Sequence, residues 1–305
     1  MHIYLPIAEM TVSAESVLLL GTFVGFLSGV FGVGGGFLTT PFLIFMGIPP
    51  AIAVGTQANQ LVATSLSGIL GHWRKGNVDI QIGAVMLAGS LVGTFLGTLI
   101  FKLLHYLGQI DFVISILYIA FLGTIGVMML FESAFSLVRH KKKTVRSEFN
   151  SMKLSPFINS LPYKMRFARS KLYISALVPA GIGFLGGLLV SILGIGGGFL
   201  LVPAMIYVLG MPSLLVAGTA LFQIIFTTAF ATILQSVTNH TVDALLALLL
   251  IAGGVVGAQF GVRISRRITG AHARVILAIL VLVVCFQLLG QLFIRPDELY
   301  STVVL

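Results

Sequence analysis

The sequence predicts an all-α polytopic membrane protein, built as an inverted repeat of two homologous halves with 8–10 membrane segments and glycine-broken or re-entrant helices. Three observations support this fold class: an apolar composition, a glycine triplet that occurs twice, and a reversal of positive charge between equivalent loops. Hydrophobic residues make up 57% of the 305 residues and charged residues only 9%. A soluble domain carries roughly a quarter charged residues, so the composition excludes an ordinary soluble fold.

Long apolar runs recur along the whole chain. The runs that are long enough to cross a bilayer cover about residues 16–31, 51–71, 80–103, 110–137, 172–193, 214–235, 243–262 and 275–294. Two shorter runs, 37–47 and 199–210, directly follow the glycine triplets. They are too short to span comfortably as helices, so we interpret them as half-helices or re-entrant segments. The sequence leaves open whether they span or re-enter.

Each glycine triplet stands between a long apolar run and a proline, Pro41 in the first case and Pro203 in the second. Consecutive glycines leave the backbone free to depart from helical geometry. In a membrane, non-helical backbone is tolerated only where it is buried in protein or lines a water-filled cavity. We therefore predict a helix break within a translocation site at both triplets, which consist of Gly34, Gly35 and Gly36 and of Gly196, Gly197 and Gly198.

Other glycines recur at every fourth position, which is the pattern of closely packed membrane helices. One such ladder and its counterpart consist of Gly89, Gly93 and Gly97 and of Gly253, Gly257 and Gly261. We interpret both ladders as packing surfaces rather than as binding sites.

The repeat extends well beyond the triplets. Gly21 and Gly25 recur as Gly183 and Gly187, at an offset of 162 residues. A unit of this length is far longer than a solenoid repeat and is typical of a duplicated half-transporter. We expect a first membrane half over residues 1–138, a basic loop over residues 139–171 and a second membrane half over residues 172–305.

Positive charge predicts how the halves are oriented. Ten of the 18 Lys and Arg residues lie between Arg139 and Lys171, which places this loop in the cytoplasm next to anionic lipid headgroups. Arg74 and Lys75 follow one apolar run, and the equivalent loop of the second half has neither Lys nor Arg. The next loop shows the opposite bias, so equivalent loops favour opposite sides and both termini lie outside. Concentrated in loops, the net charge of +9 does not indicate a nucleic-acid partner.

The apolar runs hold no Lys or Arg at mid-membrane depth, so a bound anion must be held by neutral groups. A helix that starts at a triplet directs free N–H groups and about half a positive charge toward the break. Hydroxyl and amide side chains can add hydrogen bonds, and the candidates are Thr39, Thr40, Thr56, Gln57, Asn59, Gln60, Thr219 and Gln223. The four amides fit an interhelical hydrogen bond about as well as a site. For Asp79 and Asp243 we expect helix capping.

Enzyme signatures are missing from the chain. It contains no HExxH zinc motif, no nucleotide-binding P-loop and no nucleophile elbow. A single cysteine, Cys285, rules out an intrachain disulfide and a cysteine-based metal site. We therefore expect no enzyme and no cofactor. The residues fit a secondary transporter best; a passive anion channel, or a membrane scaffold that docks a partner through the basic loop, are the alternatives.

The two triplets with their prolines, Gly55-Thr56, the stretch His72-x-x-x-Gly76-x-Val78 and the glycine ladders resemble the TauE/SafE family, also called TSUP, over about residues 16–294. The resemblance implies a bacterial inner-membrane exporter of small sulfur-containing anions such as sulfite or sulfonates. It also places the site at the triplets and the Gly-Thr turns. The second half has Ala220-Leu221-Phe222 where the first has Gln57-Ala58-Asn59, so we expect the first half to supply more of the side chains. The exact substrate, the direction, the coupling ion and the oligomeric state stay open.

Overall fold

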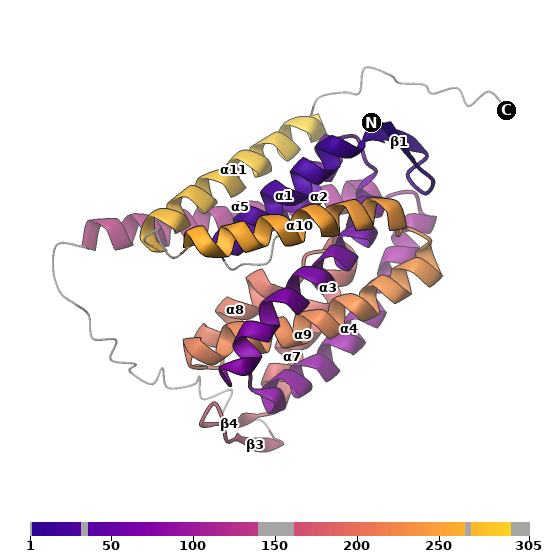
Figure 1. The fold of residues 1–305 in the computed structure, drawn as a ribbon. Helices are drawn as coiled ribbons and strands as arrows, with labels where there is room; N and C mark the ends of the chain where they lie inside the picture. Colours follow the sequence, from indigo (N-terminus) through magenta and orange to yellow (C-terminus); the bar gives the residue numbers. More distant parts are fainter. Residues whose placement is uncertain (1, 32–35, 140–161, 266–269, 294–305) are drawn as a thin grey trace.

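The computed structural model describes residues 2–31, 36–139, 162–265 and 270–293. The first part of the chain forms β1 (His2–Leu5), β2 (Met10–Ser13), α1 (Ala14–Phe31), α2 (Gly36–Phe45), α3 (Pro50–Arg74), α4 (Ile80–Tyr106) and α5 (Ile110–Arg139). The second part forms β3 (Lys164–Phe167), β4 (Leu172–Ser175), α7 (Leu177–Leu193), α8 (Gly198–Tyr207), α9 (Ser213–Leu234), the π-helix η1 (Gln235–Asn239), α10 (Ala244–Ser265) and α11 (Gly270–Phe293). Apart from η1, both parts have the same order of elements (Figure 1).

The all-α polytopic membrane class is confirmed. Within the described ranges, five helices are long and apolar enough to cross a membrane, and they lie in α4, α5, α9 with η1, α10 and α11. Large apolar side chains such as Phe131, Leu248 and Phe286 are exposed on their surfaces, as expected where lipid replaces water as the solvent. The helices α1 and α7 are shorter, and the total of eight to ten membrane segments stays a prediction.

The helix pairs of the fold are related by an exchange of the two halves. Helix α1 of the first half packs against α10 of the second half. With the halves exchanged, α7, which corresponds to α1, packs against α4, which corresponds to α10. Two further close pairs, α5 with α11 and α3 with α9, join equivalent helices. Each half therefore completes the other rather than folding beside it. The inverted orientation of the halves across a membrane stays a prediction.

The glycine ladders pack helices closely, as predicted. A Cβ built on Gly89 would lie 2.0 Å from the carbonyl oxygen of Ala180, and one built on Gly93 would lie 2.0 Å from that of Phe184. Helix α4 thus contacts the backbone of α7 directly. In the equivalent pair, a Cβ on Gly257 would lie 2.0 Å from the carbonyl oxygen of Thr22. Any side chain at these positions would separate the helices.

Each half begins with a short antiparallel hairpin that the apolar pattern did not predict. His2 pairs with Ser13 in the first hairpin, and Lys164 pairs with Ser175 in the second, at the 162-residue offset of the glycines. The prediction of a membrane segment from residue 172 is therefore wrong at its start, because residues 172–175 form β4 and α7 begins at Leu177. Figure 1 shows the β1–β2 and β3–β4 hairpins at well-separated ends of the molecule.

The second hairpin is fastened to the membrane helices by its apolar side chains. Phe167 and Ile174 are buried in one hydrophobic cluster with Met205, Leu209 and Met211 of the second half. This packing explains why strand pairing prevails over a longer helix at residues 172–175. Residues 140–161, the larger part of the predicted basic loop, lie outside the described residues.

Candidate functional site

The helices α7 and α8 are separated by the second glycine stretch. Helix α7 ends at Leu193 and α8 begins at Gly198. Between them, Gly194 has a φ of +65° and Gly197 a φ of +67°, a backbone region that favours glycine. A Cβ on Gly194 would also lie 2.8 Å from the carbonyl oxygen of Val54 in α3. Glycine is therefore required there both by the backbone conformation and by the close approach of α3.

In the first half, α1 ends at Phe31 and α2 begins at Gly36. Gly34 and Gly35 of the predicted site lie outside the described residues. Gly36, Phe37 and Leu38 at the start of α2 are buried. The equivalent residues at the start of α8 include the buried Gly198. Two short helices thus begin inside the protein, and the first N–H groups of a helix have no partner within that helix.

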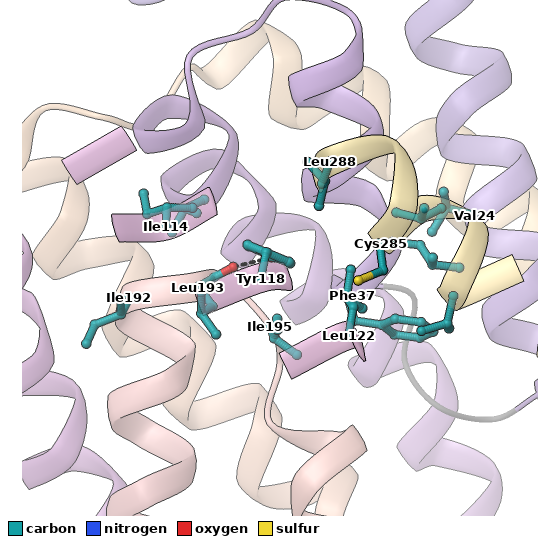
Figure 2. Close-up of a cluster of buried hydrophobic side chains, with 14 of the residues drawn as sticks. Val24, Phe37, Ile114, Tyr118, Leu122, Ile192, Leu193, Ile195, Cys285 and Leu288 are labelled. Atoms are coloured by element: carbon teal, nitrogen blue, oxygen red, sulfur yellow. Dashed lines mark hydrogen bonds between the residues drawn. The ribbon is translucent and has the colours of Figure 1, made fainter. Parts of the chain in front are cut away.

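The carbonyl end of α7 is occupied by hydrogen-bond donors from other helices. The carbonyl oxygen of Ser191 accepts a hydrogen bond of 2.8 Å from Nε2 of Gln235 in η1. The carbonyl oxygen of Leu193 accepts one from the hydroxyl of Tyr118 in α5, as Figure 2 shows. Gln235 is held in turn by Asn239, whose Nδ2 donates to its Oε1 over 2.6 Å. These donors offset the negative end of the α7 dipole next to the glycine stretch.

Tyr118 and Gln235 were missed by the sequence reasoning. Tyr118 is a fully buried polar side chain within a long apolar run, and it lies in the hydrophobic cluster drawn in Figure 2. Gln235 ends an apolar run and is 1% exposed. A lone buried hydroxyl or amide in such a run is a weak signal, because only the fold shows which carbonyl it faces.

The two glycine stretches meet at one side chain, Leu61 of α3. A Cβ built on Gly36 would lie 2.8 Å from Cδ1 of Leu61, and a Cβ built on Gly196 would lie 2.9 Å from the same atom. Cδ2 lies 3.0 and 3.1 Å from these two positions. The beginning of α2 and the stretch before α8 therefore approach Leu61 from different halves of the chain.

A small hollow lies beside this meeting point. Its lining comes from three helices of the first half and consists of Gly25, Ser28, Gly36, Gln57, Gln60, Leu61 and Thr64. The free space within it is on the order of what a single water molecule requires. The hollow as it stands therefore has no room for a larger solute.

The hollow brings together two of the predicted amide side chains. Gln57 is fully buried, and neither its Oε1 nor its Nε2 has a hydrogen-bond partner among the described residues. Its Nε2 would lie 3.1 Å from a Cβ on Gly36, so it faces the start of α2. Gln60 donates from Nε2 to the carbonyl oxygen of Leu250 over 3.2 Å, while its Oε1 is unpartnered. Buried polar groups without partners are uncommon and costly, so these atoms are available to a ligand.

The structure places the two candidate Gly-Thr threonines elsewhere. Oγ1 of Thr56 accepts a hydrogen bond from the backbone N–H of Asp243, and Oγ1 of Thr219 accepts one from that of Asp79. Both threonines therefore join the two halves instead of lining the hollow. The aspartates behave as expected, because Oδ1 of Asp79 accepts from the N–H groups of Gln81 and Ile82 and Asp243 does the same at α10.

The remaining candidates are not among the described residues that line the hollow. Thr39 and Thr40 are buried within α2, and Oγ1 of Thr40 has no hydrogen-bond partner among the described residues. Asn59 is half-buried on α3. Gln223 of α9 is 1% exposed, and its two amide atoms are unpartnered in the described part of the chain. Gln223 occupies the position in the second half that Gln60 occupies in the first.

Among the described residues, no ionisable side chain lines the hollow. Within the described ranges, the chain also contains no group of three His, Cys, Asp or Glu residues that could hold a metal ion. The chemistry of this region is limited to amides, hydroxyls and helix N-termini. Such groups can bind a small polar or anionic solute.

Comparison with known proteins identifies the family of the chain. The model of the family "Sulfite exporter TauE/SafE" matches residues 17–288. The chain is 30% identical to the probable membrane transporter protein YjnA of Bacillus subtilis, over 88% of this chain and 96% of the relative. It is 25% identical to the probable membrane transporter protein YunE of the same species, over 90% and 97%. It is also 25% identical to the probable membrane transporter protein MJ0441 of Methanocaldococcus jannaschii, over 86% and 90%. No solved structure shows a significant match.

Proposed function

This chain belongs to the sulfite exporter TauE/SafE family of membrane transporters, and on that premise we propose that it is a secondary transporter that exports small sulfur-containing anions such as sulfite or sulfonates. The chain is a multi-pass membrane protein and not an enzyme. We propose the identity of the solute, its direction of movement and the residues that bind it.

One observation carries the proposal: the two glycine stretches converge on Leu61 beside a hollow that contains unpartnered amide groups. Nε2 of Gln57 can donate to an oxyanion, and the start of α2 and the stretch before α8 both approach Leu61 beside it, where the positive end of a helix dipole favours an anion. Each helix end contributes roughly half a positive charge. The described lining of the hollow contains no cationic side chain, so we expect binding that is weak enough for the anion to leave again.

The lining of the hollow supports an unequal contribution of the two halves. Ser28 and Gln57 line it in the first half, and the equivalent positions in the second half hold Val190 and Ala220. The apolar Ala220 instead joins a hydrophobic cluster. We therefore propose that side-chain recognition comes mainly from the first half, while Gly196, Gly197 and Gly198 contribute backbone.

The wider arrangement is also part of the proposal. We place the protein in the bacterial inner membrane, with residues 139–171 in the cytoplasm, both termini outside, and two membrane halves over residues 1–138 and 172–305. A passive anion channel of the same architecture is the alternative, because the part of the lining that the structure describes contains no carboxylate that could relay a proton. A membrane scaffold that acts through its basic loop is a further alternative from another class.

Flux measurements on the purified protein in lipid vesicles test the proposal. Vesicles are loaded with radiolabelled sulfite, sulfate, thiosulfate or methanesulfonate, and release is followed with and without imposed pH and sodium gradients. We expect release of at least one sulfur anion, and accumulation against its electrochemical gradient when a coupling gradient is imposed. Accumulation excludes a channel, whereas strictly downhill flux supports one. Absence of flux for all four anions would overturn the proposal.

A matched pair of variants then tests the site. Gln57→Leu removes the unpartnered amide from the hollow, and we expect a loss of flux of about tenfold or more. Asn59→Leu changes an amide on the same helix that does not line the hollow. We expect its flux to stay within about twofold of the wild type, as for a residue away from the site. Equal losses in both variants would contradict the placement of the site.

A further inference from the structure

We infer that Leu61 is an apolar gate, which separates the polar hollow of the first half from the glycine stretch of the second half and must move during each transport cycle. This inference rests on the proposed function, because it assigns a role within the same site. Nothing in the sequence pattern distinguishes Leu61 from the other leucines of its apolar run.

Leu61 lies between the two glycine stretches. Its Cδ1 would lie 2.8 Å from a Cβ built on Gly36 and 2.9 Å from a Cβ built on Gly196. The side chain therefore fills the space between the start of α2 and the stretch before α8. An anion bound by Gln57 cannot reach the start of α8 while the isobutyl group occupies this space.

Leu61 is buried next to polar side chains and outside the hydrophobic clusters. A buried leucine usually belongs to a hydrophobic core, but Leu61 is 2% exposed and belongs to none of the three hydrophobic clusters found in the described ranges. It lines the hollow together with four polar side chains, Ser28, Gln57, Gln60 and Thr64. Two of these, Gln57 and Gln60, have amide atoms without a hydrogen-bond partner among the described residues, so Leu61 packs next to polar groups and not within an apolar core.

The repeat supplies an internal comparison. Ile224 of α9 occupies the position in the second half that Leu61 occupies in the first. In contrast to Leu61, Ile224 belongs to a hydrophobic cluster, together with Leu201, Val216 and Ala220. The two halves thus use equivalent apolar residues differently: one is packed into a core, and the other closes a polar hollow.

Glycine at residues 36 and 196 gives Leu61 the space that it occupies, because neither residue has a side chain. With any Cβ at residue 36 or 196, Leu61 would have to shift, because carbon atoms do not approach within 3.0 Å. The glycines therefore leave Leu61 room to close and, once it has moved, leave backbone N–H groups accessible to the solute. This arrangement is that of a small apolar lid between two polar surfaces.

A flux experiment in lipid vesicles tests the gate. Leu61→Ala removes the bulk of the lid, and we expect the downhill release of methanesulfonate or sulfite to rise at least about threefold, with a loss of uphill accumulation. Ile69→Ala shortens another buried apolar residue of α3 that does not line the hollow. We expect its flux to stay within about twofold of the wild type. Unchanged flux and unchanged accumulation in Leu61→Ala would overturn the gate.

A labelling experiment covers the case in which Leu61→Ala does not fold. Cys285 is the only cysteine, so Leu61→Cys in a Cys285→Ala background gives a protein with one thiol. The labelling rate with a small thiol reagent is measured with and without saturating methanesulfonate, since sulfite itself would consume the reagent. We expect the anion to change the rate at least about threefold, and an equal rate would overturn the gate.

The two proposals fail in different ways. If the wild type moves none of the four anions, the proposed function fails and the gate fails with it. If the wild type transports while Leu61→Ala and Leu61→Cys show no change, only the gate fails.

Discussion

The backbone N–H of Asp79 donates a hydrogen bond of 2.9 Å to Oγ1 of Thr219, which fastens the start of α4 in one half to α9 in the other. The same bond occurs with the halves exchanged, because the backbone N–H of Asp243 donates to Oγ1 of Thr56 over 3.0 Å. All four residues are at most 1% exposed. The Gly-Thr pairs of the repeat, which were expected to form turns, lie within α3 and α9. Their threonines are cross-links between the halves.

The two aspartates also hold the hairpins. Oδ2 of Asp79 accepts a hydrogen bond of 3.0 Å from the backbone N–H of Ser170, and a second one from the hydroxyl of the same serine. Oδ2 of Asp243 accepts one of 3.2 Å from the N–H of Ile7. Each aspartate thus caps its own helix and binds the hairpin that precedes the opposite half. Because these bonds join the halves at two separate places, they restrain relative motion of the halves.

Asp79→Ala is predicted to destabilise the protein by about 2 kcal/mol or more, because it removes a helix cap and the bonds to Ser170. The apparent melting temperature in detergent, followed by fluorescence, measures this loss. Asp79→Asn keeps one acceptor oxygen and should melt between Asp79→Ala and the wild type. If Asp79→Ala melts like the wild type, the cap and the hairpin contact do not contribute to stability.

Tyr118→Phe is predicted to destabilise the protein by about 1–3 kcal/mol, because the carbonyl oxygen of Leu193 would be left buried without a donor. The hydroxyl of Tyr118 is the group that reaches this carbonyl in Figure 2. The measurement is again the melting temperature, together with vesicle flux. Tyr106→Phe is the matched control, since Tyr106 is 88% exposed. Equal melting of both variants would show that the hydroxyl does not stabilise the end of α7.

Much of the helical architecture could be predicted from apolar runs, because length and composition decide whether a segment can cross a membrane. The close packing at Gly89 and Gly93 was likewise readable, since their spacing has few other uses in a membrane helix. The hairpins could not be predicted, because two strands of four residues at the edge of an apolar run give no periodic signal. Residues 172–175 belong to an apolar run and still pair with β3.

The candidate site was predictable in its residue types and not in its geometry. Gln57 and Gln60 stood out as buried amides, and both line the hollow. Thr56 and Thr219 stood out equally, and they hold the halves together instead. Leu61 did not stand out at all, because the role of a leucine depends on what the fold places around it. The identity of a side chain limits its chemistry, and only tertiary contacts decide which partner it meets.

Gly89→Ala is predicted to destabilise the α4–α7 contact, because its Cβ would lie 2.0 Å from the carbonyl oxygen of Ala180. Overpacking of this kind typically costs about 1–3 kcal/mol. Gly181→Ala provides the control on α7, since a Cβ there would have nothing within 4 Å. Gly181→Ala should leave stability unchanged or raise it by up to about 1 kcal/mol through helix propensity. Melting temperatures that fall equally for both variants would contradict the backbone contact.

Gly196→Ala and Leu61→Ala are predicted to couple, because the added methyl group of the first meets the side chain that the second removes. Alone, Gly196→Ala forces Leu61 to shift from a contact of 2.9 Å, and Leu61→Ala leaves a cavity. The double variant should therefore be more stable than the sum of the two single effects by about 1–2 kcal/mol. Gly290→Ala combined with Leu61→Ala is the matched control, since a Cβ on Gly290 has nothing within 4 Å and should give additive effects. Chemical unfolding of all five variants in the same detergent yields both coupling energies. Additive effects in the Gly196 pair would mean that the second glycine stretch does not meet Leu61, and the convergence of the two halves at one side chain would have to be abandoned.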